Sequence, residues 1–98
     1  MSYRFEAEVW LHQGDAAWYF LTLPAEVSDD IEARTSHLSR GFGSVRVRVH
    51  IGATSWATSV FPDTKRGAYI LPVKKEVRRA EGIDDGSVTA VRLELVEV

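Results

Sequence analysis

The sequence predicts a mainly β protein, a small six-stranded barrel with two short helices and an internal repeat. Apolar and polar residues alternate along several segments, as they do in strands that bury one face. Two short segments space their apolar residues as helices do, and each of them follows a proline. Closure into a barrel would remove the exposed edges of so many short strands.

The length and composition predict one globular domain over residues 1–98. The chain has a mass of 11.0 kDa, with 45% hydrophobic and 27% charged residues. Cysteine is absent, which excludes disulfides, a thiolate nucleophile and cysteine-based metal sites. No apolar run is long enough for a membrane span, and no apolar secretory segment follows the N-terminus. We therefore expect a soluble, cytoplasmic domain.

The first half reads as two strands followed by a helix. Residues 3–12 alternate cleanly, and turn residues follow before a second strand at 16–23. That second strand is apolar on both faces, so we expect it to be central and covered twice, with Trp18 in the core. Pro24 then opens a helix that ends near Ser39, and its apolar side is formed by Val27, Ile31, Thr35 and Leu38.

The second half reads as three strands, a short helix and a last strand. Strands are expected at residues 44–51, 54–61 and 68–71, and a final strand at 87–96. Between them, Pro72 is expected to open a helix whose apolar side is Val73, Val77 and Ala80. Gly82 is expected to close that helix, with Ile83 making the apolar contact that follows a C-cap glycine.

The two halves share one order of features. Residues 19–27 and 68–77 each run from a strand through Leu-Pro into a Glu-Val helix, and a glycine turn and a strand follow in both. The repeat predicts that residues 18–51 and 68–96 form equivalent units related by a pseudo-two-fold axis.

The second copy of the repeat resembles the swapped-hairpin proteins of the AbrB and MazE type. The resemblance lies in residues 71–79, in Gly82-Ile83 and in residues 85–88. In those proteins two chains interlock into one barrel, whereas this chain looks like both halves fused, which implies a monomer. It departs from their pattern by two extra residues between Pro72 and Glu76, and the first-half counterpart of Arg78-Arg79 is Ser28-Asp29.

Nearly the whole chain is similar to a bacterial family of unknown function. The shared features are the tryptophan-rich second strand, the Leu-Pro helix, the Gly-x-Val-Arg-Val strand, the Tyr-x-Leu-Pro-Val-Lys-Lys-x-Val-Arg segment and the Gly-Ile turn. Members are often fused to a YdeI/OmpD-associated, bacteriocin-protection-like domain. The resemblance implies a double-split β-barrel and supplies no established activity.

Charge is spread unevenly along the chain. Residues 1–33 carry one base and seven acids, residues 34–79 carry ten bases and two acids, and residues 80–98 carry one base and five acids. The basic middle could form an anion-binding face, or its bases could pair with the acidic segments. The candidate anion-binding residues are Arg46, Arg48, Lys65, Arg66, Lys74, Lys75, Arg78 and Arg79. Trp10 is the candidate surface aromatic residue.

No motif predicts catalysis or a metal site. His12, His37 and His50 lie on different elements without metal-ligand spacing, and Ser44, Ser55 and Ser59 are not at a nucleophile elbow. Residues 40–47 resemble the octapeptide of RNA-recognition motifs, but two of its stacking positions are Ser44 and Val47. We expect no enzyme activity, no cofactor and no metal.

Three hypotheses on function remain. The first is a non-enzymatic binding module for an anionic partner, for example nucleic acid. The second is a protein-interaction module, which an exposed apolar patch near Trp10 would favour. The third is a small-ligand carrier or an enzyme, which titratable groups clustered in a cleft would favour.

Overall fold

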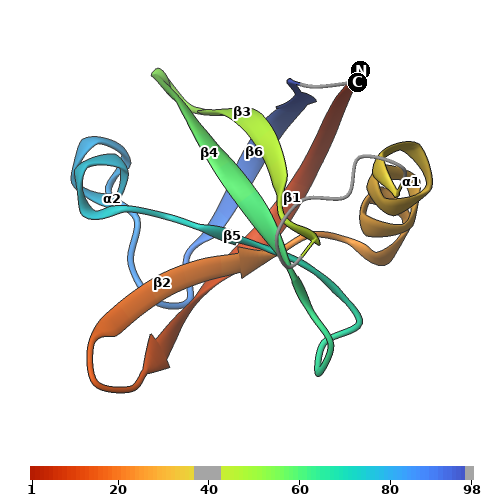
Figure 1. The fold of residues 1–98 in the computed structure, drawn as a ribbon. Helices are drawn as coiled ribbons and strands as arrows, with labels where there is room; N and C mark the ends of the chain where they lie inside the picture. Colours follow the sequence, from red (N-terminus) through yellow and green to blue (C-terminus); the bar gives the residue numbers. More distant parts are fainter. Residues whose placement is uncertain (37–42, 97–98) are drawn as a thin grey trace.

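The computed structural model describes residues 1–36 and 43–96, and its six strands form a closed antiparallel barrel (Figure 1). The strand order around the barrel is β1-β2-β5-β4-β3-β6. The elements are β1 (Ser2–Gln13), β2 (Ala17–Thr22), α1 (Ala25–Thr35), β3 (Val45–Ile51), β4 (Thr54–Asp63), β5 (Ala68–Pro72), α2 (Lys75–Glu81) and β6 (Val88–Leu95). The mainly β barrel with two helices is therefore confirmed.

The inner face of the barrel is the core. In β3, Val47, Val49 and Ile51 are buried while Arg46 and Arg48 point outward, as the alternation predicts. The two helices lie on opposite sides of the barrel (Figure 1). Each contributes apolar side chains to the same core, including Ile31 from α1 and Val77 from α2. Within the described residues, neither helix has the length and apolarity that crossing a membrane requires.

Strand pairing has the two-fold symmetry that the repeat predicts. The hairpin β1–β2 corresponds to β4–β5, and β3 corresponds to β6. Thus β1 pairs with β6 as β4 pairs with β3, while the equivalent strands β2 and β5 pair with each other. Leu21 lies opposite Leu71 in the β2–β5 pair, and both are fully buried.

The Leu-Pro segments are not the equivalent positions of the two halves. The Leu23 amide donates to the Tyr69 carbonyl at 2.9 Å, and the Val73 amide donates to the Tyr19 carbonyl at 2.8 Å. Tyr19 therefore corresponds to Tyr69 and Leu23 to Val73. The sequence that repeats is Tyr-x-Leu-x-apolar, at residues 19–23 and 69–73. Pro24 follows the first copy, whereas Pro72 lies within the second.

The expected opening of the second helix at Pro72 is wrong. Pro72 is the last residue of β5, a strand position where a missing amide donor costs little, and α2 begins at Lys75. Ala80 is exposed rather than part of the apolar side. The C-terminal end is as expected, because Gly82 is left-handed and the Ile83 amide donates to the Arg78 carbonyl at 2.9 Å.

The first helix begins after Pro24, which stands at the N-cap position directly before Ala25, and the described helix runs to Thr35. The expected continuation to Ser39, with Leu38 and His37, lies outside the described residues. The Tyr3 hydroxyl donates to Asp30, which also accepts from Arg34 Nε at 2.8 Å, so α1 is tied to β1. Burial and the bond to Asp30 raise the pKa of Tyr3 to about 12.

The expectation that β2 is covered on both faces is also wrong. Tyr19 and Leu21 face the core side, but Trp18 is 55% exposed. No residue of either described helix lines the outer face around Trp18 and Phe20, since α1 packs chiefly on β5 and α2 on β4. An apolar outer face is therefore left open on the barrel.

Replacing the paired core leucines tests the symmetric core. Leu21→Ala and Leu71→Ala should each lower the free energy of unfolding by about 2–5 kcal/mol, since each leaves a cavity at a fully buried position. Urea denaturation followed by far-UV circular dichroism measures the change. The exposed strand variant Ala57→Ser is the control and should stay within about 0.5 kcal/mol. A large difference between the two leucine variants would contradict an equivalent role for the two halves.

Candidate functional site

The predicted anion-binding residues lie in three separate places. Arg46 and Arg48 are on the outer face of β3, and Lys65 and Arg66 are in the loop between β4 and β5. The other four, Lys74, Lys75, Arg78 and Arg79, are on or next to α2. Figure 1 shows α2 and the β4–β5 loop on opposite sides of the molecule. The eight bases therefore do not form one continuous face.

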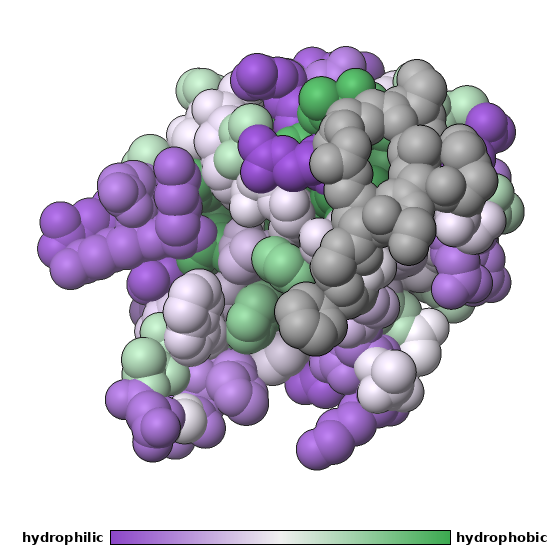
Figure 2. All heavy atoms as spheres, in the orientation of Figure 1, coloured by the Kyte–Doolittle hydropathy of each residue, from purple (hydrophilic) through white to green (hydrophobic). Residues whose placement is uncertain are grey.

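The α2 bases form the densest group. Strongly hydrophilic side chains project where α2 lies (Figure 2). Arg78 has a structural role, because its Nε donates to the Val73 carbonyl at 3.1 Å and its guanidinium lies 3.8 Å from the centre of the Tyr19 ring. Lys74, Lys75 and Arg79 are exposed, and no described carboxylate lies within ion-pair distance of them.

Trp10 is less open than the sequence suggests. Its indole N–H donates to the Thr22 hydroxyl at 2.9 Å, and the Arg66 guanidinium lies 3.8 Å above the ring. Asp63 Oδ2 lies 3.8 Å from Arg66 Nε. Arg66 thus covers part of Trp10 and joins the β4–β5 loop to β1.

An aromatic groove crosses the outer face of β2, β5 and β4 beside Trp10. It encloses about 670 Å³. Its lining residues are His12, Gly14, Asp15, Ala16, Trp18, Phe20, Thr58, Phe61, Ile70 and Pro72. We call this surface the aromatic groove. Its large apolar side chains are open to solvent, with Trp18 55% and Phe61 41% exposed.

The rings of the groove are already arranged against one another. Trp18 and Phe20 stack with centroids 6.2 Å apart and an angle of 14° between their planes. Phe20 also lies 5.1 Å from Trp10. Strand register explains the order, since Phe20 pairs with Trp10 on one side and with Pro72 on the other. The groove can bind a flat or apolar group without rearrangement of its floor.

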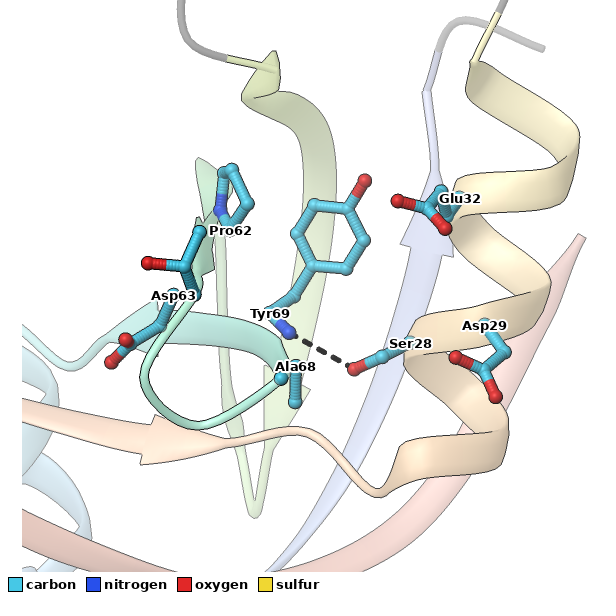
Figure 3. Close-up of a pocket in the computed structure, with 9 residues that line it drawn as sticks. Ser28, Asp29, Glu32, Pro62, Asp63, Ala68 and Tyr69 are labelled. Atoms are coloured by element: carbon cyan, nitrogen blue, oxygen red, sulfur yellow. Dashed lines mark hydrogen bonds between the residues drawn. The ribbon is translucent and has the colours of Figure 1, made fainter.

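A second pocket lies between α1 and the β4–β5 loop (Figure 3). It encloses about 210 Å³, and the Tyr69 amide at its floor donates to Ser28 Oγ at 3.0 Å. Its charged lining residues, Asp29, Glu32 and Asp63, are all carboxylates. Burial raises the pKa of Tyr69. This lining opposes an anionic ligand and contains none of the predicted bases.

Residues 5–93 match the family model DUF1905, which is described as a domain of unknown function. The chain belongs to the DUF1905 family. The match covers most of the barrel, from β1 to β6, and thus includes both the aromatic groove and α2. No curated protein matches the sequence. Membership of DUF1905 therefore supplies no activity, and function has to be argued from the surface of the domain.

The histidines of this DUF1905 domain are placed as follows in the described residues. Within residues 1–36 and 43–96, no three His, Asp or Glu side chains are placed to hold a metal ion. His12 lines the aromatic groove, His37 lies outside the described residues, and His50 bonds to Ser55 and Glu94. The RNA-recognition-like segment 40–47 lies only partly within the described residues.

Sequence reasoning missed most of the groove. The sequence assigns Phe20, Phe61 and Ile70 only to strands and Pro72 to the start of a helix, and a strand that is apolar on both faces, as β2 is, reads as buried. The available signal was the shortage of helices, since two short helices cannot cover the outside of six strands. The alternation in the first strand does place His12, which lines the groove, and its neighbour Trp10 on the outside.

The Arg66–Trp10 stack yields a testable prediction. Arg66→Ala should lower the free energy of unfolding by about 0.5–1 kcal/mol, because it removes an exposed cation–π contact. It should also increase the quenching of tryptophan fluorescence by acrylamide, since Trp10 loses its cover. Lys65→Ala removes the neighbouring charge without the stack and is the control. Equal effects of the two variants would contradict the stacking role.

Proposed function

We propose that this DUF1905 domain is a protein-binding module and that the aromatic groove is its binding surface. The observation that carries the proposal is the group of rings in the groove, the exposed Trp18 and Phe61 and the half-buried Phe20, on a face that neither described helix lines. Exposed aromatic side chains in a groove are typical of surfaces that bury another protein's apolar residues.

The charge of the groove favours a protein over a nucleic acid. Single strands also bind to stacked aromatic rings, but their affinity requires bases that neutralise phosphates. Among the described residues, neither lysine nor arginine lines the groove, and Asp15 is the one carboxylate in its lining. Arg66 nearby is engaged by Trp10 and Asp63. A polyanion would thus gain stacking and little electrostatic attraction.

The occupant that fits is an extended apolar segment of a second protein with a lysine or arginine placed near Asp15. The closed barrel pairs all six strands, so the partner cannot add a strand along most of the sheet and must be recognised by side chains. Closure of the barrel by one chain supports our expectation that the domain acts as a monomer. The bacterial family that the sequence resembles is often fused to a YdeI/OmpD-associated domain. Such a fusion fits a domain whose role is to bind another protein.

Selection from a library of random displayed peptides tests this proposal. Peptides enriched on the wild-type domain should carry apolar or aromatic residues together with a base. Their affinity should fall at least about tenfold for Trp18→Ala and Phe61→Ala, since exposed aromatic anchors dominate such interfaces. Binding is measured by fluorescence anisotropy with the selected peptide.

Arg46→Ala, on the outer face of β3, is the matched control and should bind normally. Selected peptides that bind equally well to both groove variants would overturn the proposal, as would a library that yields no binder. If Trp18→Ala instead abolishes self-association seen in sedimentation, the occupant is a second copy of this chain.

A weak polyanion site on α2 is the second candidate. Lys74, Lys75 and Arg79 support it, because they are exposed and have no carboxylate partner among the described residues. Labelled DNA and RNA at low salt should bind, and affinity should fall about tenfold or more toward physiological salt. A variant with alanine at Lys74, Lys75 and Arg79 should not bind the labelled DNA or RNA. Its free energy of unfolding should change little.

Arg78 is left intact in that variant, because its bonds to Val73 and Tyr19 are structural. Lys65→Ala, in the loop on the other side of the molecule, is the control. Absence of binding at high protein concentration in low salt would exclude this candidate.

A further inference from the structure

A row of polar side chains crosses the outer face of four adjacent strands, away from the aromatic groove. Arg4 of β1 lies opposite Arg92 of β6, Arg92 lies opposite His50 of β3, and His50 lies opposite Ser55 of β4. Four residues that are distant in the sequence are thus brought into one line by register alone.

The row borders a hollow of about 450 Å³. Arg4, Arg92 and His50 line one part of it. Glu6, Ala90 and Gly52 line the rest of the hollow, and Glu6 lies opposite Ala90 on the neighbouring strand. Ala90 and Gly52 leave space for a ligand, because they have little or no side chain. The hollow therefore has two guanidinium groups at its edge and one carboxylate, that of Glu6.

The described part of the protein supplies little counter-charge to the two arginines. Like charges directly opposite each other on neighbouring strands destabilise a sheet unless a counter-charge is present. Among the described residues, no carboxylate lies within ion-pair distance of Arg4, and Arg92 has one distant contact, from Nη1 to Glu94 Oε2 at 3.6 Å. Glu6, two residues from Arg4 on β1, makes no ion pair within the described residues.

His50 accounts for the weak contact of Glu94 with Arg92. Its Nε2 lies 2.7 Å from Glu94 Oε1, and its Nδ1 lies 2.7 Å from Ser55 Oγ. Because Nε2–H donates to the carboxylate, Glu94 is held toward β3. This bond from His50 is the main reason that the pKa of Glu94 lies below its usual value. Arg92 is thereby kept from closing a bidentate pair with Glu94.

We propose that Arg4 and Arg92 form a binding site for a phosphate monoester in this hollow, with His50 as a positioning residue. A dianionic phosphate supplies the counter-charge that the opposed arginines lack, and each guanidinium can offer it two parallel N–H groups. Glu6 is placed to accept from a hydroxyl group of the same ligand. The site is separate from the aromatic groove, because no described residue lines both.

Titration with inorganic phosphate, followed by NMR of the arginine Nε–H groups at constant ionic strength, tests the site. Saturable shifts are expected at Arg4 and Arg92, and phenyl phosphate should produce the same shifts. Arg92→Gln and Arg4→Gln should each weaken binding about tenfold or more, because each removes a charge-assisted pair of hydrogen bonds. Lys65→Gln removes a base elsewhere and should leave the affinity within about twofold.

Two further variants separate the site from a general effect of charge. Glu94→Gln should strengthen binding, since a competing carboxylate is removed, and His50→Ala should weaken it, since Glu94 is released toward Arg92. Backbone spectra show whether each variant is folded, and Arg92→Lys keeps the charge without the planar fork and should bind with intermediate affinity. Linear shifts without saturation, equal shifts with acetate, or unchanged affinity in both glutamine variants of the arginines would overturn the proposal.

Discussion

Pairing of β2 with β5 is the contact on which the rest of the structure depends. It joins the two halves at Leu21 and Leu71, and the amides of Leu23 and Val73 extend it on either side. Without it the two hairpins would expose unpaired edges and the core would be open on that side. Since β2 and β5 are equivalent strands, this contact also fixes the symmetry of the barrel. Each half covers the apolar face of the other.

The strands were predictable because burial on one face leaves a period of two in the sequence. In β3 the pattern of Val47, Val49 and Ile51 against Arg46 and Arg48 admits no other interpretation. The register of the repeat was not predictable in the same way. Leu-Pro is the more visible shared pair in the sequence, but the backbone hydrogen bonds make Tyr19 and Tyr69 the equivalent positions. A proline at a strand end does not indicate how that strand is aligned with its partner.

The candidate sites escaped sequence reasoning for two physical reasons. Outward apolar residues such as Phe20 and Phe61 look the same in the sequence whether another element covers them or solvent does. The His50–Glu94 bond joins residues that are 44 positions apart, and only the pairing of β3 with β6 brings them together. The predicted bases do not lie together, because α2, β3 and the β4–β5 loop are on different sides of the barrel. Their shared place in the basic middle of the sequence does not show which side each element faces.

The pseudo-two-fold axis relates the residues within each site to one another. The Trp10–Phe20 pair of β1 and β2 corresponds to the Phe61–Ile70 pair of β4 and β5, so symmetric apolar pairs lie in and beside the aromatic groove.

On the other side of the barrel, the Arg4–Arg92 pair corresponds to the Ser55–His50 pair. The inside of the barrel must keep its symmetry, because both halves fill one core. The outside is free to diverge, and it has done so at both sites. Trp18 of β2 lies at the position that Ala68 occupies in β5. Arg4 of β1 corresponds to Ser55 of β4, and Arg92 of β6 corresponds to His50 of β3. A surface that lies on such an axis consists of two equivalent half-sites. Where the equivalent positions carry different residues, the two half-sites together form one asymmetric site that can orient a ligand. Both sites depart from the two-fold symmetry of the core at these positions, and this asymmetry is a reason to expect specific recognition there.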